Sequence, residues 1–191
     1  MTTKKKTFNA AIFLALLGGT LYLSFLLTKY VTQDETSIAL IQEFGPIGIL
    51  IISFIAGLNA LVPIPAATFI PIFTAGGISL PFATLLLITG TLCADLVAYA
   101  IGIYGSKVTS AHYPNLQQKL IKLYTDKKKW VPYLIFGFAA FIPFPNEIYL
   151  IPLGIIGIKL RQFIIPLLLG TALYQTLAAL GVYNIFKYFL L

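Results

Sequence analysis

The chain has 191 residues, of which 59% are hydrophobic and only 10% are charged. Soluble domains contain roughly 25% charged residues, and a globule of this size could not bury so much apolar surface. The net charge of +7 therefore indicates contacts with anionic headgroups rather than with nucleic acid, and we expect an all-α integral membrane protein.

Residues 1–37 begin with three lysines, Lys4–Lys6, and continue into the uncharged run Phe8–Leu27. This run of 20 residues forms a helix of roughly 30 Å, the thickness of the hydrocarbon layer. It is longer than the apolar core of a signal peptide, and the polar stretch 33–37 follows it. We predict a retained transmembrane anchor, so that residues 1–37 form the first unit of the chain.

Two pairs of prolines, Pro63 with Pro65 and Pro143 with Pro145, interrupt apolar sequence. Proline lacks the amide hydrogen and disfavours helix in the residue before it, so each pair predicts irregular backbone at membrane depth. Such backbone is tolerated only inside protein or beside water. A shift of 80 positions superimposes the two pairs and gives 12 identities over residues 55–98, which indicates an internal duplication.

The apolar arm Trp130–Phe141 is too short to cross a bilayer, so the second proline pair predicts the tip of a hairpin that returns to its own face. The duplication extends this prediction to Gly45–Gly77. One full span, Phe82–Tyr104, separates the hairpins and places them on opposite faces. We therefore predict an inverted repeat with two facing re-entrant helical hairpins plus full transmembrane spans, with the first repeat at 38–104 and the second at 131–191.

The connection between the repeats, residues 105–130, is rich in lysine and has apolar residues at helical spacing. It predicts either an amphipathic cytoplasmic helix on the bilayer surface or a solvated connector. The hairpin topology puts eleven of the thirteen basic residues on one side and two on the other, whereas a complete crossing by residues 38–58 would divide the thirteen into four and nine. The positive-inside rule then predicts a cytoplasmic N-terminus. The eleven are Lys4, Lys5, Lys6, Lys107, Lys119, Lys122, Lys127, Lys128, Lys129, Lys159 and Arg161, and the other two are Lys29 and Lys187.

Two carboxylates, Asp95 and Glu147, stand in apolar sequence, where an acidic residue costs roughly 2.5 to 3.5 kcal/mol. Each should be neutral, paired or beside water. A functional role is one interpretation. The alternative is packing, with Asp95 bonded to Tyr99 or to free hairpin amides, and Glu147 capping the helix that follows it.

Other polar residues complete the candidate transport path. Lys159 and Arg161 follow the second hairpin and either snorkel to headgroups or bind an anionic group or Glu147. Gln175 is the residue that the duplication aligns with Asp95. The remaining candidates are Tyr99, Asn146 and Asn59.

The string Asp-x-x-x-Tyr-x-x-Gly-x-x-Gly at 95–105, with Pro-Ile-Pro at 63–65 and Phe-Ile-Pro at 141–143, resembles the DedA/VTT superfamily of membrane proteins. The resemblance covers residues 45–183. It implies facing re-entrant hairpins and a role in moving lipids between leaflets, by phospholipid scrambling or by transport of polyprenyl phosphate carriers, with proton coupling proposed for bacterial members. In this comparison Asp95 matches the acidic residue of the family's middle span.

Two positions depart from the pattern of this family. The expected Gly-Glu after the first tip is Ala66-Ala67, and Asn146 stands where the family has an arginine. Glu147 instead places a carboxylate at the second tip. The resemblance therefore implies a divergent member.

No catalytic motif is visible, so we do not expect an enzyme, and we expect no cofactor. Single Cys93 and His112 residues argue against a metal site, and we place Cys93 in the core and His112 at the surface. We expect a lipid flippase or scramblase with a polar path at the hairpin tips. The alternatives are a proton- or ion-coupled exporter of small cationic solutes, and a noncatalytic scaffold whose Lys-rich loop binds anionic lipid or a partner.

Overall fold

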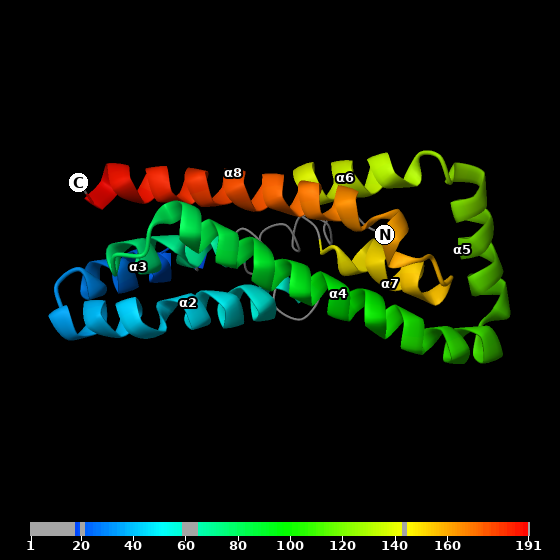
Figure 1. The fold of residues 1–191 in the computed structure, drawn as a ribbon, viewed down its shortest axis with the longest axis horizontal. Coiled ribbons are helices and arrows are strands. Elements are labelled where there is room, and N and C mark those ends of the chain that lie inside the picture. Colours follow the sequence, from blue (N-terminus) through cyan, green and yellow to red (C-terminus); the bar gives the residue numbers. More distant parts are fainter. Residues whose placement is uncertain (1–17, 20–21, 59–64, 143–144, 191) are drawn as a thin grey trace, which may run out of the picture.

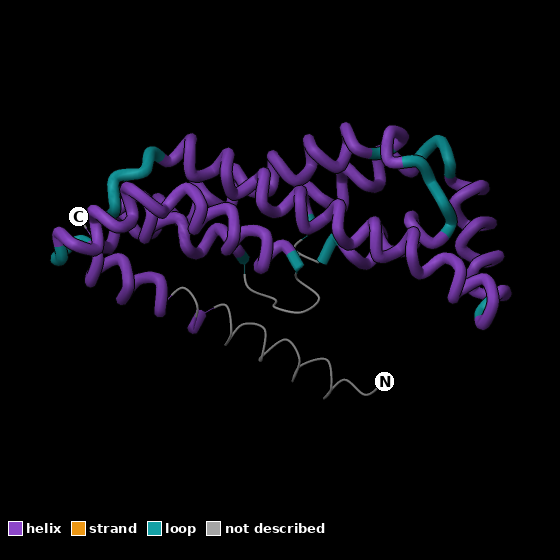
Figure 2. Tube along the Cα trace, turned by 60° about the horizontal axis from the view of Figure 1, so that its bottom comes forward, coloured by secondary structure: helices purple, strands orange, loops and turns teal. Residues whose placement is uncertain are grey.

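The structure is a computed structural model that describes residues 18–19, 22–58, 65–142 and 145–190. All regular secondary structure in these ranges is helical, and short connections join the helices (Figure 2). Three of the predicted site or tip residues, Asn59, Pro63 and Pro143, lie outside the described residues, as do residues 8–17 and 20–21 of the predicted anchor.

The first half of the chain forms helices that turn back at mid-length of the molecule. A helical segment at residues 22–31 precedes α2 (Glu35–Gly57), whose N-cap Asp34 accepts a bond of 3.0 Å from the Ser37 amide. Bonds from Ser37 also lower the pKa of this half-buried carboxyl group. The 3₁₀-helix η1 (Ala66–Phe69) and α3 (Ile70–Ala75) then return toward the start of α2 (Figure 1).

The longest helix, α4 (Leu80–His112), runs the whole length of the molecule (Figure 1). Its 33 residues correspond to roughly 50 Å of helix. It continues past the predicted end at Tyr104 because the next proline, which disfavours helix in the residue before it, is Pro114.

The second half repeats the order of two helices of opposite direction followed by a long helix. Helix α5 (Pro114–Lys127) lies across the end of the molecule, α6 (Val131–Phe141) and α7 (Glu147–Ile155) run in opposite directions, and after η2 (Leu160–Gln162) α8 (Ile164–Leu190) returns along α4 (Figure 1). The observed α6 agrees with the predicted short arm.

Among the described residues, three helices are long and apolar enough to cross a membrane: α2, α4 and residues 164–188 of α8. Together with the all-helical architecture of the described residues, this confirms the prediction of a helical membrane protein. The surface of these helices exposes many large apolar side chains, as lipid contact requires. Cys93 is among the exposed residues, so its predicted place in the core was wrong: it lies on the opposite side of α4 from the buried positions around it.

Helices α3 and α7 end in the same backbone geometry, 80 residues apart. Gly77 has φ +95° and Gly157 has φ +73°, a left-handed conformation that costs glycine little. After each glycine, an amide bonds to the carbonyl five residues before it, from Ile78 to Phe73 and from Ile158 to Leu153, both at 3.1 Å. This is the Schellman arrangement for satisfying the last carbonyls of a helix.

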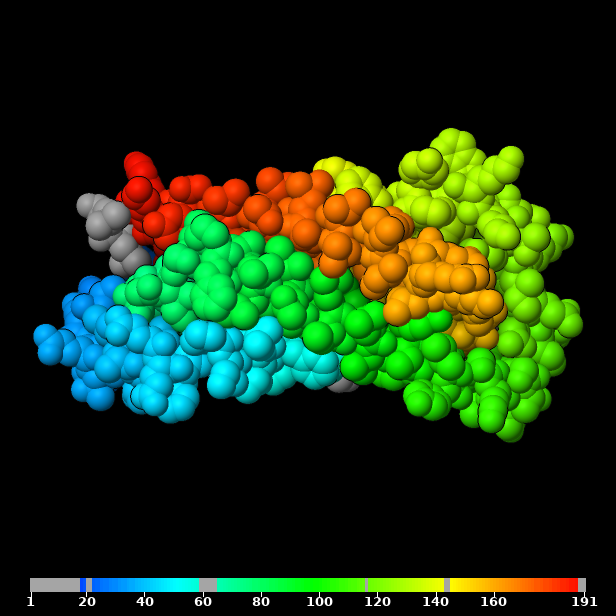
Figure 3. Space-filling view, in the orientation of Figure 1, coloured from blue at the N-terminus to red at the C-terminus, as the bar shows by residue number. Residues whose placement is uncertain are grey.

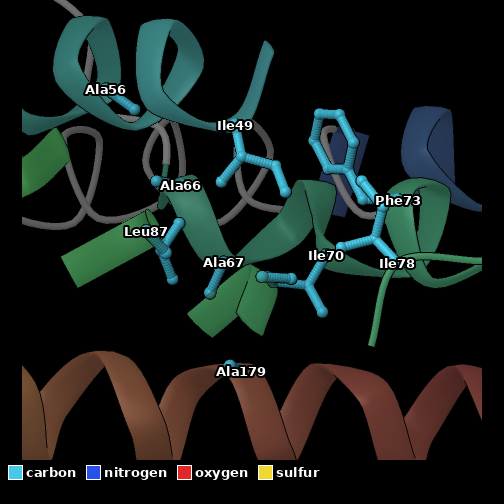
Figure 4. Close-up of a cluster of buried hydrophobic side chains, with 10 residues drawn as sticks. Ile49, Ala56, Ala66, Ala67, Ile70, Phe73, Ile78, Leu87 and Ala179 are labelled. Carbon is cyan, nitrogen blue, oxygen red and sulfur yellow. The ribbon is translucent and has the colours of Figure 1, made fainter. Parts of the chain in front are cut away.

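Two hydrophobic clusters form the core. In the first, η1 and α3 lie between α2, α4 and α8, with Ala67 and Ile70 near Ala179 of α8 (Figure 4). In the second, α7 packs along α4 (Figure 3), and Leu150 of α7 and Leu167 of α8 both belong to the cluster. Each long helix therefore packs against the short helix that belongs to the other half of the chain.

Glycines allow the helices to approach closely. A Cβ added at Gly102 would collide with the Ile151 carbonyl oxygen, and one added at Gly154 would collide with the Tyr99 carbonyl oxygen. An added Cβ at Gly170 would lie 2.7 Å from Ala139 Cβ. Because lipid tails provide no hydrophobic drive for helix association, such close backbone contact is a main source of packing energy in membranes.

We expect Gly102→Ala to destabilise the protein by about 1 to 3 kcal/mol, because the new methyl group overpacks the α4–α7 contact. The matched control is Gly105→Ala, three residues further along α4, where an added Cβ meets nothing within 4 Å and alanine favours helix. Thermal unfolding of the detergent-solubilised variants measures both effects. Equal midpoints of thermal unfolding for Gly102→Ala and Gly105→Ala would refute the close contact between α4 and α7.

Candidate functional site

Asp95 lies near the middle of α4 and is only 3% exposed. Its position is roughly 23 Å from the start of the helix by helical rise, close to the midpoint of the helix. Ala94 and Ala98 beside it are fully buried, so the carboxyl group points into the protein rather than toward lipid.

The Asp95 carboxyl group accepts hydrogen bonds from two other helices. Asn146 Nδ2 lies 3.1 Å from Oδ1 and 3.0 Å from Oδ2, and Thr171 Oγ1 lies 3.5 Å from Oδ2. Asn146 belongs to the start of α7 and Thr171 to α8. The cost of burying the acid is thus offset by donors from elements distant in sequence.

Asn146 can serve Asp95 because it does not cap its own helix. It occupies the N-cap position of α7 with helical φ −63° and ψ −21° and makes no side-chain capping bond. The Ile148 amide bonds instead to the Pro145 carbonyl at 3.2 Å, so the first turn begins one residue early. The side-chain amide is left to face α4.

Two further polar groups complete the cluster. Glu147 is 6% exposed and, like Tyr149, lies close enough to Asp95 to interact with it electrostatically. The Tyr149 ring packs edge-on against Phe138 of α6 with centroids 5.0 Å apart, and its hydroxyl oxygen is buried. We call Asp95, Asn146, Glu147, Tyr149 and Thr171 the Asp95 cluster.

The end of α2 reaches α4 at the same level. A Cβ added at Gly57, the last residue of α2, would lie 2.7 Å from Ala94 Cβ and 3.1 Å from Thr91 Cα. Ala94 precedes Asp95, to which the start of α7 is bonded. Helix α2 therefore ends, and α7 begins, at the level of this carboxyl group.

The other predicted path residues are distributed differently. Gln175 is buried one turn beyond Thr171 on α8. Pro65 caps η1 and Pro145 precedes Asn146. The Tyr99 hydroxyl donates to the Ile158 carbonyl at 2.6 Å, so the suggested Asp95–Tyr99 bond was wrong: Tyr99 holds the turn after α7.

Lys159 and Arg161 are exposed and lie at the opposite end of α7 from Glu147. Helix α7 has nine residues, which is roughly 13 Å. The suggested contact between Arg161 and Glu147 is therefore not formed, because the whole length of α7 separates them.

Two members of the cluster, Thr171 and Tyr149, were absent from the sequence-based candidates. The duplication contained a signal for Thr171, because it aligns with Thr91, four residues before Asp95. Spacing gave no signal for Tyr149, because its approach to Asp95 depends on how α7 packs along α4. Within the described residues, no group of three His, Cys, Asp or Glu side chains is placed to bind a metal ion.

We expect Asn146→Ala and Asp95→Ala to be energetically coupled, because each removes one partner of the same pair of contacts. Interhelical hydrogen bonds in membranes give coupling energies of about 0.6 kcal/mol, up to about 1.7 kcal/mol. A double-mutant cycle on thermal or denaturant unfolding measures this value. Asn184→Ala, at an exposed site on α8, should show no coupling to Asp95→Ala, and strict additivity for Asn146→Ala would contradict the pairing.

We expect Tyr99→Phe to lower stability by about 0.5 to 1.5 kcal/mol, because it removes one buried hydrogen bond. The edge-on contact of this ring with Phe163, at 5.3 Å, should persist. Tyr104→Phe on the same helix is the control, because Tyr104 is 82% exposed. The midpoint of thermal unfolding distinguishes the two, and an unchanged midpoint for Tyr99→Phe would argue against a stabilising bond from Tyr99 to the Ile158 carbonyl.

Comparison with known proteins places this arrangement in context. The family model described as the VTT domain matches residues 64–184, a range that includes every member of the Asp95 cluster. No curated protein and no solved structure matches the chain.

Proposed function

The chain belongs to the VTT-domain family, whose members are membrane proteins proposed as transporters, and we propose that it moves lipids between the two leaflets of its membrane. Members of this family are generally regarded as non-enzymatic. The observation that carries the proposal is the buried Asp95 cluster near the middle of α4, at the level where α2 ends and α7 begins.

In this proposal the α2–α3 and α6–α7 pairs are re-entrant hairpins of an inverted repeat. Three observations support it. Figure 1 places the pairs in opposite halves of the molecule, α3 and α7 end in the same turn 80 residues apart, and each of them contacts the long helix of the other half.

A polar headgroup needs water or polar partners while it crosses the hydrocarbon layer. Carboxyl, amide and hydroxyl groups at the level of Asp95 provide such partners, and Gln175 extends the polar surface along α8. Acyl chains would remain in the bilayer beside the exposed apolar faces of α4 and α8. Discontinuous helices at the midplane are a common way to build such a path.

Charge supports an orientation for this arrangement. Around α5 the described residues include eight basic side chains and one acidic side chain, Asp126. The opposite end has Lys29 and Lys187 with Asp34, Glu35 and Glu43. By the positive-inside rule the α5 end faces the cytoplasm, and in the proposed topology the N-terminus lies on that side. The eight are Lys107, Lys119, Lys122, Lys127, Lys128, Lys129, Lys159 and Arg161.

Reconstituted vesicles that contain fluorescent phospholipids or polyprenyl phosphate test the proposal. The wild-type protein should accelerate leaflet exchange above that of empty vesicles. Asp95→Asn should lower the rate about tenfold, which corresponds to about 1.4 kcal/mol of lost stabilisation in the path, while the protein still elutes as a monodisperse species.

The control is Glu43→Gln, which removes an exposed carboxylate from α2 far from the cluster. It should leave the exchange rate unchanged. Exchange that never exceeds that of empty vesicles, across all headgroups, would refute lipid transport. Parallel loss of exchange and of folding in Asp95→Asn would restrict Asp95 to a packing role.

A second candidate is a proton- or ion-coupled exporter of small cationic solutes. It is favoured by the absence of Lys, Arg and His from residues 30–106, 130–158 and 162–186, which include both buried carboxyl groups. A site with two acids and no basic residue in these segments suits an ammonium group better than a phosphate. Solute flux driven by a pH gradient, without leaflet exchange, would favour this candidate.

A further inference from the structure

A compact basic and aromatic surface lies where α5 meets α6. We define it as the α5–α6 corner: Lys127, Lys128, Lys129, Trp130 and Tyr133. All five side chains are exposed, with Trp130 at 65% and Tyr133 at 71%. The two rings contact each other edge-on with centroids 6.2 Å apart.

The aromatic pair indicates the depth of this corner in the membrane. Trp and Tyr concentrate at the headgroup level because each ring has an apolar body and a polar edge. From Val131 to Phe141, α6 has no charged residue, so it extends from the corner into the hydrocarbon layer. The three consecutive lysines are therefore held at the level of the headgroups rather than in bulk water.

The charge of the corner suits an anion. Asp126 is the only acidic residue between Asp95 and Glu147 in the sequence, so the three lysines and this aspartate sum to +2. The first turn of α6 has no acidic residue, and the positive end of its helix dipole adds to the same field. Lys119 and Lys122 on α5 are exposed as well and strengthen the local potential.

Hydrogen bonds also connect α5, which leads into the corner, to α7 and to η2. Gln117 Nε2 of α5 donates to the Ile155 carbonyl of α7 at 3.4 Å, and the Tyr124 hydroxyl donates to Gln162 Oε1 at 2.8 Å. Tyr124 packs against the second hydrophobic cluster. A ligand held at the corner is therefore fixed relative to both ends of the α6–α7 pair.

We propose that the α5–α6 corner is a binding site for the anionic phospholipid headgroups of the leaflet that faces α5, and that this binding anchors the start of α6. Lysine ammonium groups attract the phosphate and its net charge, while Trp130 and Tyr133 lie against the glycerol and upper acyl region. The site is separate from the Asp95 cluster and does not depend on whether the protein transports lipid.

The chain contains a single tryptophan, and this residue lies in the corner, so its fluorescence reports the composition of the adjacent lipid. The full-length protein is reconstituted into phosphatidylcholine vesicles containing a fixed fraction of phosphatidylglycerol. In one sample the phosphatidylglycerol has brominated acyl chains, and in the other an equal amount of phosphatidylcholine has them. Bromine quenches tryptophan on contact, so the ratio of the two quenching values measures local enrichment of the anionic lipid.

We expect phosphatidylglycerol to quench Trp130 at least twofold more than phosphatidylcholine does at low salt, and the excess to fall at high salt because screening weakens the attraction. Lys128→Gln with Lys129→Gln should abolish the excess, whereas Lys128→Arg with Lys129→Arg should keep it. Lys29→Gln with Lys187→Gln removes the same charge at the opposite end of the molecule and should also keep it.

Equal quenching by the two lipids in the wild-type protein would overturn the proposal, as would an excess that survives in the Lys128→Gln, Lys129→Gln variant. Added glycerol phosphate at the same concentration tests whether a soluble phosphate suffices. If it removes the excess, the corner binds phosphate in general and the assignment to lipid is wrong.

Discussion

The burial of one carboxyl group, Asp95, constrains how the rest of this protein is assembled. An acid at the middle of a 33-residue apolar helix is tolerated only with partners, and α4 has none to offer from its own backbone. The donors come from Asn146 and Thr171, which are 51 and 76 residues further along the chain. The carboxyl group therefore requires α7 and α8 to lie against α4, and it fixes which faces of those helices meet.

Close backbone packing supplies the rest of the specificity. Gly102 and Gly154 let α4 and α7 approach along one line, and Gly170 does the same for α8 and α6. In lipid, helices associate through such contacts and through polar bonds rather than through exclusion of water. The two effects agree here, because the α4–α7 contact that the glycines allow is the one that brings Asn146 to Asp95.

The buried carboxyl groups and the exposed lysines occupy different parts of the molecule. Both buried carboxyl groups lie in segments without any basic residue, while the lysines gather around α5 at one end. The middle of the protein is thus suited to groups that interact with acids, amides and hydroxyls. The α5 end is suited to the anionic surface of a leaflet, which attracts clusters of lysine.

The sequence by itself determined the class of the protein, the short arm that became α6, the two acidic residues and the 80-residue relation between Gly77 and Gly157. These features follow from composition, from helix-breaking residues and from local spacing, all of which act along the chain. Only the tertiary structure decided that Asp95 bonds Asn146 rather than Tyr99, that Thr171 and Tyr149 join it, and that Cys93 faces outward. Those outcomes depend on the rotation and register of the helices against each other. In a helix that is apolar on nearly every side, the sequence does not show which face packs against protein and which faces lipid.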